Sequence, residues 1–541
     1  MKTRGADRLM ETLAQAGVRR IFTVSGNHVM SVFDAVTDSG IELVHARHEA
    51  AAVHMADAAS RISGEIGVAL VTGGPGHANA VSALYTARMC ESPVLLLSGH
   101  AANRELGMGA FQEMRQADIA APLAKASSTC SSADAVAGDI ALAIRAAQSG
   151  RPGPVHLSLP FDALEGDAGA SSIPPASNLA PDPLALDSRT ADALLQRLRR
   201  ASRPLIIVGP AALTRRGRAL AATLEDATNV PVVGMESPRG IADPSLGAFA
   251  EVLQQADCVL LIGKRLDFTL QFGRPPALSQ QCVFLQIDAD QSELERARRA
   301  VGDRVAVSAM ADAFSALATL TQSAAANGSA RSSWRDDVRD AIRYRPPSWG
   351  EARATARERL HPVEALRPLQ ALLDSHPDSA LVADGGEFGQ WAQACVSAPH
   401  RVINGVAGAI GTALPYAIGV RSVLPDAPVV AVLGDGTFGF HPAEIDTAVR
   451  YKLPFVALIG NDARWNAEYQ IQLRDYGADR AHGCELLPTR YDLVAAAFGG
   501  HGELVTDASE LPAAVERSQR SGLPACVNVM IEGVAAPKIR R

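Results

Sequence analysis

Two short polar segments in the last third of the chain each follow an apolar run. Residues 434–437 are Gly-Asp-Gly-Thr and come directly after residues 429–433, and Asn461-Asp462 comes soon after residues 455–459. A carboxylate such as Asp435, with a second oxygen ligand near 461 or 462, suits a hard divalent cation, and a Gly-rich turn at a helix start offers backbone N–H donors to phosphate. The pattern therefore predicts a site for a divalent cation and a diphosphate group.

A Gly-Asp-Gly triplet can also be an ordinary turn without function. Two features favour a binding site: Asp435 and Asp462 are 27 positions apart, and each lies near the end of a predicted buried strand. The carboxyl ends of neighbouring parallel strands meet at one edge of a sheet, which is where ligands bind in such proteins. Gly436 also lets a ligand approach the backbone closely.

This segment resembles the thiamine-diphosphate enzyme family of acetolactate synthase, benzaldehyde lyase and 2-hydroxyacyl-CoA lyase, which has Gly-Asp-Gly and a closing Asn-Asn pair here. The resemblance implies thiamine diphosphate and Mg²⁺ as cofactors. It implies metal ligands at Asp435, Asp462 and the carbonyl of Arg464, and diphosphate contacts at Gly434, Gly436 and Thr437. The chain differs from the pattern because the second Asn of the pair is Asp462, so Asn461 is the alternative ligand.

Two further segments resemble cofactor contacts of the family. Residues 405–415 are similar to the stretch beneath the bent cofactor, where the Gly408 carbonyl would accept a hydrogen bond from the aminopyrimidine and Ile410 would lie between the two rings. A branched apolar side chain there can force the amino group against the reactive carbon. The alternative is that Ile410 is an ordinary core aliphatic. Gly386 and Glu387 lie where the family contacts the diphosphate.

In the first third of the chain, residues 44–57 predict a short strand followed by a helix with Glu49 in its first turn. A lone Glu there is usually a solvated partner of the helix dipole. The segment from His48 to Ala52, however, resembles the family's His-Glu-x-x-Ala segment, whose Glu hydrogen-bonds the pyrimidine ring. By this resemblance Glu49 is catalytic: it protonates the ring, favours the imino tautomer and so promotes formation of the C2 ylid.

Residues 72–79 are similar to a Gly-rich turn of the family that contacts the pyrimidine and the partner subunit. The resemblance implies that Pro75 and Asn79 bind the cofactor. The family places the Glu of one chain beside the diphosphate loop of another. We therefore expect a homodimer or a dimer of dimers with active sites shared between subunits.

Loops that the family directs at the reacting carbon contain Asn27, His28, Gln112, Trp465 and Ala467. The resemblance implies that His28 and Gln112 are catalytic and that the other three line the pocket of a small-molecule substrate. His28 can move a proton to or from a carbonyl oxygen because imidazole titrates near neutral pH; the alternative is a loop histidine bonded to backbone. Gln112 can only donate and accept hydrogen bonds, which suits the orientation of a carbonyl or carboxylate.

The stretch 261–273 is more similar to the lyase branch of the family than to the synthase branch. We therefore expect a lyase or carboligase that acts on 2-keto or 2-hydroxy carbonyl compounds through a C2 ylid and an enamine intermediate. The alternatives are the catalytic subunit of an acetolactate synthase, which decarboxylates pyruvate and ligates the product, and a homologue that binds the cofactor without catalysis. FAD is not expected, because residues 209–212 match the flavin contact of the synthases poorly.

The chain alternates helical periodicity with short apolar strands, which is typical of α/β proteins with parallel sheets. We expect three doubly wound parallel-sheet domains: a pyrimidine-binding domain at 1–165, a central Rossmann-like domain at 186–325 and a diphosphate-binding domain at 350–541. Two stretches rich in small and polar residues, 163–187 and 322–349, are predicted linkers between them.

The composition is that of an ordinary globular protein. The chain has 541 residues, of which 47% are hydrophobic and 20% charged, and a net charge of -7, which gives no electrostatic reason to expect a nucleic acid partner. No apolar run approaches the roughly 18 residues of a membrane span, and the first residues lack the apolar stretch of a signal peptide, so we expect a cytoplasmic protein. Seven scattered cysteines without a Cys-x-x-Cys pair indicate neither disulfides nor a zinc site.

Overall fold

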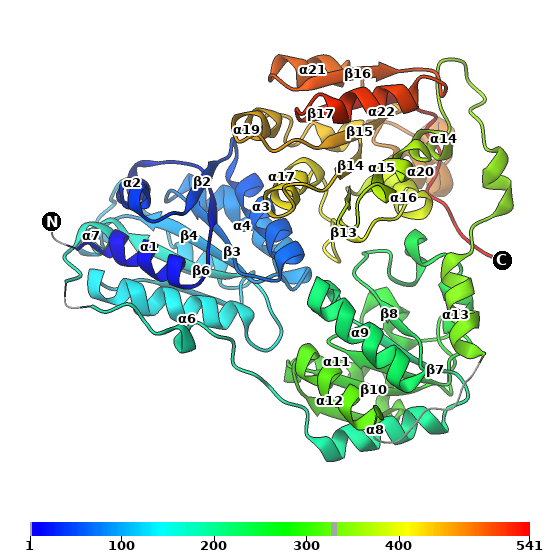
Figure 1. Ribbon diagram of the computed structural model, residues 1–541, viewed down its shortest axis with the longest axis horizontal. Helices are drawn as coiled ribbons and strands as arrows, with labels where there is room; N and C mark the ends of the chain where they lie inside the picture. Colours follow the sequence, from blue (N-terminus) through cyan, green and yellow to red (C-terminus); the bar gives the residue numbers. More distant parts are fainter. Residues whose placement is uncertain (1–2, 170, 326–332) are drawn as a thin grey trace. The chain divides into compact units, whose positions relative to one another are not determined.

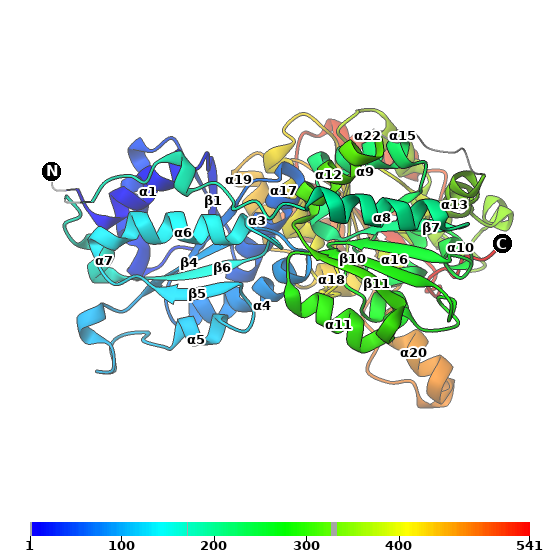
Figure 2. The same ribbon diagram turned by 90° about the horizontal axis from the view of Figure 1, so that it is seen from below.

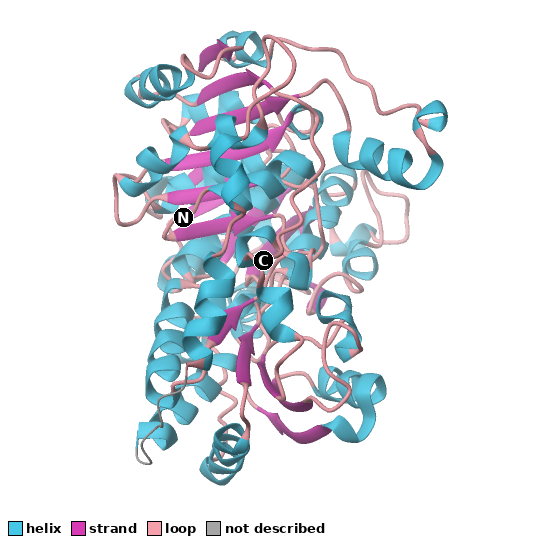
Figure 3. Cartoon of the chain, turned by 90° about the vertical axis from the view of Figure 1, so that its right-hand side faces the viewer, coloured by secondary structure: helices cyan, strands magenta, loops and turns pink. Residues whose placement is uncertain are grey.

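The computed structural model describes residues 3–169, 171–325 and 333–541 (Figure 1). The chain divides into two compact units, Met1–Ala185 and Leu186–Arg541. The first unit contains one sheet and the second contains two, and all paired strands within the described residues are parallel. Helices flank the strands (Figure 3). The predicted fold class, three doubly wound parallel sheets, is confirmed, whereas the predicted domain boundaries stay a prediction.

The sheet of the first unit has six strands in the order β2-β1-β3-β4-β6-β5. These are β1 (Arg20–Thr23), β2 (Glu42–His45), β3 (Gly67–Val71), β4 (Val94–His100), β5 (Ala126–Thr129) and β6 (Val155–Pro160). Helices α1 (Gly5–Gln15) and α6 (Val136–Gln148) cover one face, where Leu9 and Ile140 belong to the core. Helices α3 (Glu49–Ser63) and α4 (Pro75–Met89) pack together on the other face (Figure 2).

The central sheet of the second unit has the order β11-β10-β9-β7-β8. Its strands are β7 (Pro204–Val208), β8 (Val232–Gly234), β9 (Cys258–Ile262), β10 (Val283–Asp288) and β11 (Val305–Met310). Alternate residues of one strand enter different cores: Ile206 packs with α8 (Ser188–Arg200), α9 (Arg215–Thr228) and α12 (Ala313–Ala325), and Ile207 packs with α10 (Phe249–Leu253) and α11 (Gln291–Val301). This alternation follows from the two-residue period of a strand.

The segment 322–349 is not the simple linker that its composition predicts. Helix α13 (Trp334–Arg343) lies within it, and its buried residues Trp334, Val338 and Ala341 join the core on one face of the central sheet. Their spacing of four and three places them on one side of the helix. Apart from the partly buried Ile342, the other residues of the helix are charged, which hides this narrow apolar stripe in the composition. Residues 326–332 of the predicted linker lie outside the described part of the chain.

The third sheet has the order β13-β12-β14-β15-β17-β16. If β12 to β17 are matched in chain order with β1 to β6, this is the strand order of the first sheet. Its strands are β12 (Ala380–Ala383), β13 (His400–Ile403), β14 (Val429–Gly434), β15 (Val456–Asn461), β16 (His501–Val505) and β17 (Ala525–Met530). Its helices are α14 (Pro362–Leu366), α15 (Pro368–Asp374), α16 (Gly386–Cys395), α17 (Ala413–Val423), α18 (Asp435–Phe438), α19 (Glu444–Arg450), α20 (Asn466–Tyr476), α21 (Tyr491–Ala497) and α22 (Leu511–Arg520). The strands predicted at 429–433 and 455–459 are thus confirmed as β14 and β15.

A buried ion cluster joins the central and third sheets of the second unit. The Arg401 guanidinium, on β13, lies 3.1 Å from Glu236 and 3.4 Å from Asp243. Arg401 also donates to the Ser245 hydroxyl, and Arg345 donates to the carbonyl oxygens of Ser245 and Ala394. Charged groups removed from water need such partners. These contacts help to hold the two sheets in one compact unit.

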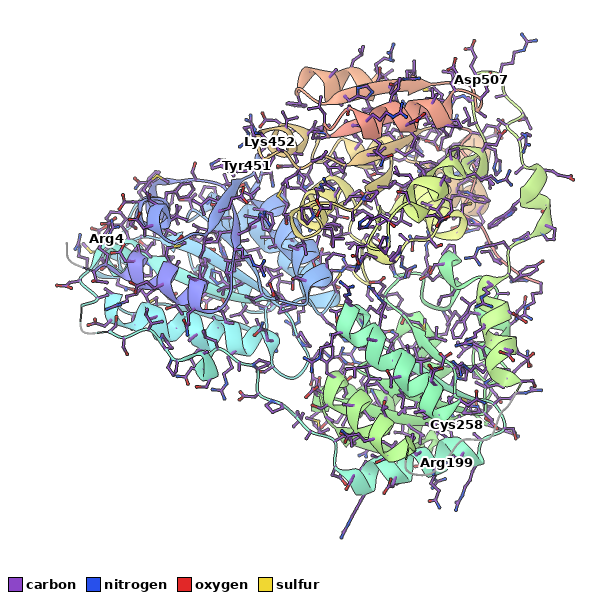
Figure 4. All side chains as sticks on the ribbon, in the orientation of Figure 1. Arg4, Arg199, Cys258, Tyr451, Lys452 and Asp507 are labelled. Atoms are coloured by element: carbon purple, nitrogen blue, oxygen red, sulfur yellow. The ribbon has the colours of Figure 1, made fainter. Side chains whose placement is uncertain are left out.

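The described residues contain no helix long and apolar enough to span a membrane. All seven cysteines are free thiols, and six of them are buried. Cys258, for example, lies in strand β9 of the central sheet (Figure 4). Burial raises the pKa of its thiol to about 12, so the group is a neutral packing residue at physiological pH.

Candidate active site

A cavity that opens to solvent lies at the carboxyl edge of the third sheet. The chain order reverses between the neighbouring strands β12 and β14, and ligands of open α/β sheets bind at such a point. Most residues predicted for the diphosphate and metal line this cavity together, namely Gly386, Glu387, Ile410, Gly434, Asp435, Gly436, Thr437, Asp462 and Arg464, along with the predicted substrate residues Trp465 and Ala467. The fold therefore brings together segments that are up to about 80 positions apart in the sequence.

Asp435 is a buried carboxylate at the end of β14. Backbone N–H groups of Gly436, Ala463 and Arg464 donate to it, but burial is the larger effect and raises its pKa to about 6. Its Oδ2 atom is buried and has no hydrogen-bond partner among the described residues. An unpartnered buried carboxylate oxygen is costly unless a cation or donor binds it. The oxygen is therefore suited to coordinate a metal ion.

The structure separates the two candidate ligands at the end of β15. The Asn461 side chain is fully buried and donates to the Thr489 carbonyl at 3.0 Å and to Asn528 Oδ1 at 3.1 Å, and its own oxygen accepts from the Ala463 N–H. Asp462 instead lines the cavity. Burial, followed by the charge of Asp435, raises the pKa of Asp462 to about 7. A buried carboxylate whose charge is disfavoured by a neighbouring carboxylate suits a site that binds a divalent cation.

Glycine backbone lines part of the cavity. A Cβ atom at Gly434 or Gly386 would meet no other atom within 4 Å, so the backbone there faces open space. A Cβ atom at Gly436 would come within 2.8 Å of the Trp465 ring, so glycine at this position lets that ring pack closely. Gly386 has a φ of +82°, which favours glycine. Such a bare surface lets phosphate oxygens reach backbone N–H groups. Together with the unpartnered Asp435 oxygen, these residues fit a diphosphate bound through a divalent cation.

Asp384 is a site residue that the sequence patterns did not single out. It is buried at the end of β12 and accepts hydrogen bonds from the N–H groups of Gly385, Gly411 and Ala413, at 2.7 to 3.1 Å. These bonds fix the loop that carries Ile410 against the start of α16. Its position could have been found by the rule that pointed to Asp435, since both are carboxylates directly after a buried strand.

Five further residues line the cavity, and one predicted contact does not. The five, for which the sequence predicts no side-chain role, are Gly385, Phe388, Gly460, Asn466 and Glu468. Gly408, predicted to contact the aminopyrimidine, does not line this cavity; it has a φ of +68°, and a Cβ atom there would lie 3.7 Å from Pro238. The predicted contact at Gly408 therefore stays a prediction.

Glu49 is the first residue of α3, directly after the loop that follows β2. Asn79 Nδ2, in α4, donates to Glu49 Oε2 at 3.1 Å. A Cβ atom at Gly76 would come within 2.8 Å of Thr72 Cγ2 and 3.4 Å of Glu49 Oε1, so glycine at this position lets Thr72 pack closely against the start of α4 beside the carboxylate. The fold thus brings Glu49 and Asn79 together, while Pro75 is an exposed residue at the start of α4. Their roles toward the cofactor stay predictions.

His28 and Gln112 lie in the same unit as Glu49. His28 is buried, its ring stacks on Phe111 with centroids 6.0 Å apart, and its Nδ1 lies 3.3 Å from Thr72 Oγ1. Burial lowers its pKa, so the neutral imidazole predominates at neutral pH. Gln112, the residue after Phe111, has a φ of +58°, and Asn27 is exposed beside His28.

Comparison with known families agrees with this arrangement. Three models of thiamine pyrophosphate enzymes match the chain: the N-terminal TPP binding domain at residues 3–119, the central domain at residues 191–320 and the C-terminal TPP binding domain at residues 384–529. Thiamine pyrophosphate is another name for thiamine diphosphate. The C-terminal model includes the cavity residues Asp435 and Asp462, and the N-terminal model includes Glu49.

Curated relatives cover nearly the whole chain. The chain is 32% identical over 551 residues to the probable acetolactate synthase of Mycobacterium bovis, an alignment that covers 99% of the chain and 98% of the relative. It is 30% identical to 2-hydroxyacyl-CoA lyase 2 of Danio rerio and 31% identical to that of Homo sapiens, with 97% of the chain covered in both cases and 91% and 90% of the relatives. The chain is thus an enzyme that belongs to the thiamine pyrophosphate family, as its residues predict.

Proposed function

We propose that the protein is a thiamine-diphosphate- and Mg²⁺-dependent lyase or carboligase that acts on 2-keto or 2-hydroxy carbonyl compounds. The observation that carries the proposal is the pair of buried carboxylates, Asp435 with an unpartnered oxygen and Asp462 beside it, in a cavity at the switch point of the third sheet. Several relatives carry the name 2-hydroxyacyl-CoA lyase 2, which supports the lyase reaction.

In this proposal each half of the site has a distinct task. Asp435, Asp462 and the Arg464 carbonyl hold Mg²⁺, and the glycine backbones and Thr437 hold the diphosphate. Thiamine diphosphate, when bound, would supply a nucleophilic carbon for addition to a carbonyl group and a ring that accepts the electrons of the carbon–carbon bond that breaks. Glu49 holds a proton at the pyrimidine nitrogen, and Asn79 keeps the Glu49 carboxylate oriented toward it.

His28 and Gln112 act on the substrate. The buried, neutral His28 can take a proton from a hydroxyl group during cleavage and return it during ligation. Gln112 donates a hydrogen bond to the carbonyl oxygen and so fixes its orientation. Asn27, Trp465 and Ala467 bound the pocket for the remainder of the substrate.

A substrate panel tests the proposal directly. The purified protein is incubated with thiamine diphosphate and Mg²⁺ and with acyloins, 2-hydroxyacyl-CoA esters or 2-keto acids, and the products are identified by mass spectrometry. We expect release of an aldehyde from an acyloin or a 2-hydroxyacyl-CoA ester, with no turnover when the cofactor is omitted. If no compound in the panel were turned over in a cofactor-dependent reaction, the proposed reaction would be contradicted.

A second candidate function is acetolactate synthesis from pyruvate. The 32% identity to a probable acetolactate synthase favours it. Acetolactate formation from pyruvate without acyloin cleavage in the same panel would replace the first function by the second. Tight cofactor binding without any exchange of the C2 proton would instead identify a homologue that binds thiamine diphosphate without catalysis.

We also propose that each complete site combines Glu49 of one subunit with the diphosphate loop of another, so that the protein is at least a homodimer. Complementation tests this arrangement. Glu49→Gln and Asp435→Asn variants, each inactive alone, are mixed under conditions of subunit exchange, and activity is expected to return to roughly one quarter of the wild-type value because half of the dimers are hybrids with one intact site each. Exchange verified by mass spectrometry without recovery of activity would contradict the shared site.

A further inference from the structure

Gln116 is a buried residue in the first unit for which no role has been assigned above. It is the first residue of α5 (Gln116–Ala120), and its side chain is almost completely enclosed. Its Oε1 accepts from the Gly74 N–H at 2.8 Å, and its Nε2 donates to the Gly99 carbonyl at 3.1 Å and to Ser158 Oγ at 3.1 Å. Both N–H groups of the amide are therefore used, and its oxygen is bonded to backbone.

The first of these bonds, from the Gly74 N–H, holds a glycine that packs against Gln112. Gly74 has a φ of +59°, a conformation that favours glycine. A Cβ atom at Gly74 would come within 2.8 Å of Gln112 Cβ and 2.9 Å of the Gln112 carbonyl oxygen. The Gln112 backbone thus packs directly against Gly74. The hydrogen bond from the Gly74 N–H to Gln116 therefore also fixes the position of the Gln112 backbone.

The second bond, to the Gly99 carbonyl, holds a glycine that packs against His28. A Cβ atom at Gly99 would come within 2.6 Å of His28 Cβ and 2.9 Å of Val29 Cγ1, so His28 rests on the Gly99 backbone. Gly73 packs against the Gly99 carbonyl, since its own Cβ would lie 2.7 Å away. The amide of Gln116 therefore connects the two glycine backbones that carry the proposed substrate-directed residues.

We infer that Gln116 is a positioning residue that fixes the distance between His28 and Gln112. The inference rests on the proposed function, in which both side chains act on one substrate oxygen. Because His28 and Gln112 come from loops after different strands, their separation depends on a link between those loops. Gln116 supplies this link with one planar amide, which bridges Gly74 and Gly99 and is held in its plane by Ser158. Small displacements of catalytic groups of about 1 Å can cost on the order of 100-fold in rate.

A double-mutant cycle tests the inference. Gln116→Met keeps the length of the side chain and removes all three hydrogen bonds, and Gln116→Glu keeps the acceptor for the Gly74 N–H but loses the donor to the Gly99 carbonyl. We expect each variant to lower kcat by about 10- to 100-fold with KM changed less than about threefold. In a protein that already carries Gln112→Ala, Gln116→Met should lower kcat by less than about threefold further, because the Gln112 amide, whose distance from His28 it fixes, is gone.

A matched control separates positioning from stability. Gln286, in β10 of the central sheet, is also fully buried and donates to the Glu293 carbonyl. Gln286→Met makes the same chemical change at a site far along the chain from His28, and its kcat should equal that of the wild type. If Gln116→Met lowered kcat by the same factor with and without Gln112→Ala, the positioning role would be overturned. A Gln116→Glu variant with wild-type kcat would also overturn it.

The same variants distinguish failure of this inference from failure of the proposed function. Exchange of the C2 proton of bound thiamine diphosphate requires Glu49 but neither His28 nor Gln112, so Gln116→Met should exchange within about threefold of the wild type. A wild-type protein without exchange would contradict the proposed function. Normal exchange combined with independent effects of Gln116 and Gln112 on kcat would contradict only the role of Gln116.

Discussion

Replacing Glu49 by glutamine is expected to lower kcat by about 10²- to 10⁴-fold, the range typical of a lost general acid or base. Glutamine keeps the shape of the side chain and can still accept a hydrogen bond from Asn79, but it has no carboxyl proton to place at the pyrimidine nitrogen. The dissociation constant of thiamine diphosphate should change less than about tenfold, since the diphosphate contacts remain intact. Turnover and cofactor titration by fluorescence measure the two effects.

Glu65→Gln is the control for this substitution, because Glu65 is an exposed residue just beyond the end of the same helix, α3. Its kcat should match that of the wild type. A Glu49→Gln protein with kcat within about threefold of the wild type would show that Glu49 has only the ordinary role of an acidic residue at a helix start.

Replacing Asp462 by alanine is expected to weaken Mg²⁺ binding by at least about 100-fold, because a carboxylate ligand is removed from a hard-cation site. Thiamine diphosphate should then dissociate on gel filtration in the presence of Mg²⁺. The metal-free variant should be no less stable than the metal-free wild type, since burial and Asp435 disfavour the charge of Asp462. Titration with Mn²⁺ followed by electron paramagnetic resonance measures the affinity, and thermal unfolding measures the stability.

Two comparison variants complete this experiment. Asn461→Ala should retain the metal but lower the melting temperature, because it removes buried hydrogen bonds to Thr489 and Asn528. Asp479→Ala, at an exposed position, should change neither property. The opposite pattern, with metal lost in Asn461→Ala and kept in Asp462→Ala, would identify Asn461 as the ligand.

The central strands of the sheets could be predicted from sequence because they are buried on both faces. Strands such as β9 and β14 are almost continuous runs of Val, Leu and Ile. Three edge strands, β5, β11 and β16, have no such pattern, because β5 is mostly exposed, β11 and β16 are mostly half-exposed, and all three carry polar or small residues. Their pairing comes from the neighbouring strand, which a local pattern does not reveal.

Some residues of the candidate site could be predicted from local sequence patterns, and others could not. Asp435, Asp462 and Glu49 lie in short contiguous motifs, so their types and spacing could be compared with a known family. Asp384 and Gln116 act through backbone groups of loops that are distant in the sequence. A single polar residue has no local signal for such a role, and only the folded chain shows which loops it joins.

The first and third sheets share one strand order, and each places its proposed functional residues after the same strands. In the third sheet, the cavity residues follow β12, β13, β14 and β15. In the first sheet, His28 follows β1, Glu49 follows β2, Pro75 and Asn79 follow β3, and Gln112 follows β4. Since loops at a switch point diverge and leave a crevice, the repeated topology explains why both cofactor-binding models fall on sheets of this order.

The exchange rate of the C2 proton of bound thiamine diphosphate tests most directly whether this protein activates its cofactor. Wild-type protein with Mg²⁺ and cofactor is mixed with D₂O, quenched with acid after defined times and analysed by proton NMR. We expect exchange at least about 100-fold faster on the wild type than on Glu49→Gln. Equal rates in the two proteins, or wild-type exchange no faster than that of the free cofactor, would contradict the account.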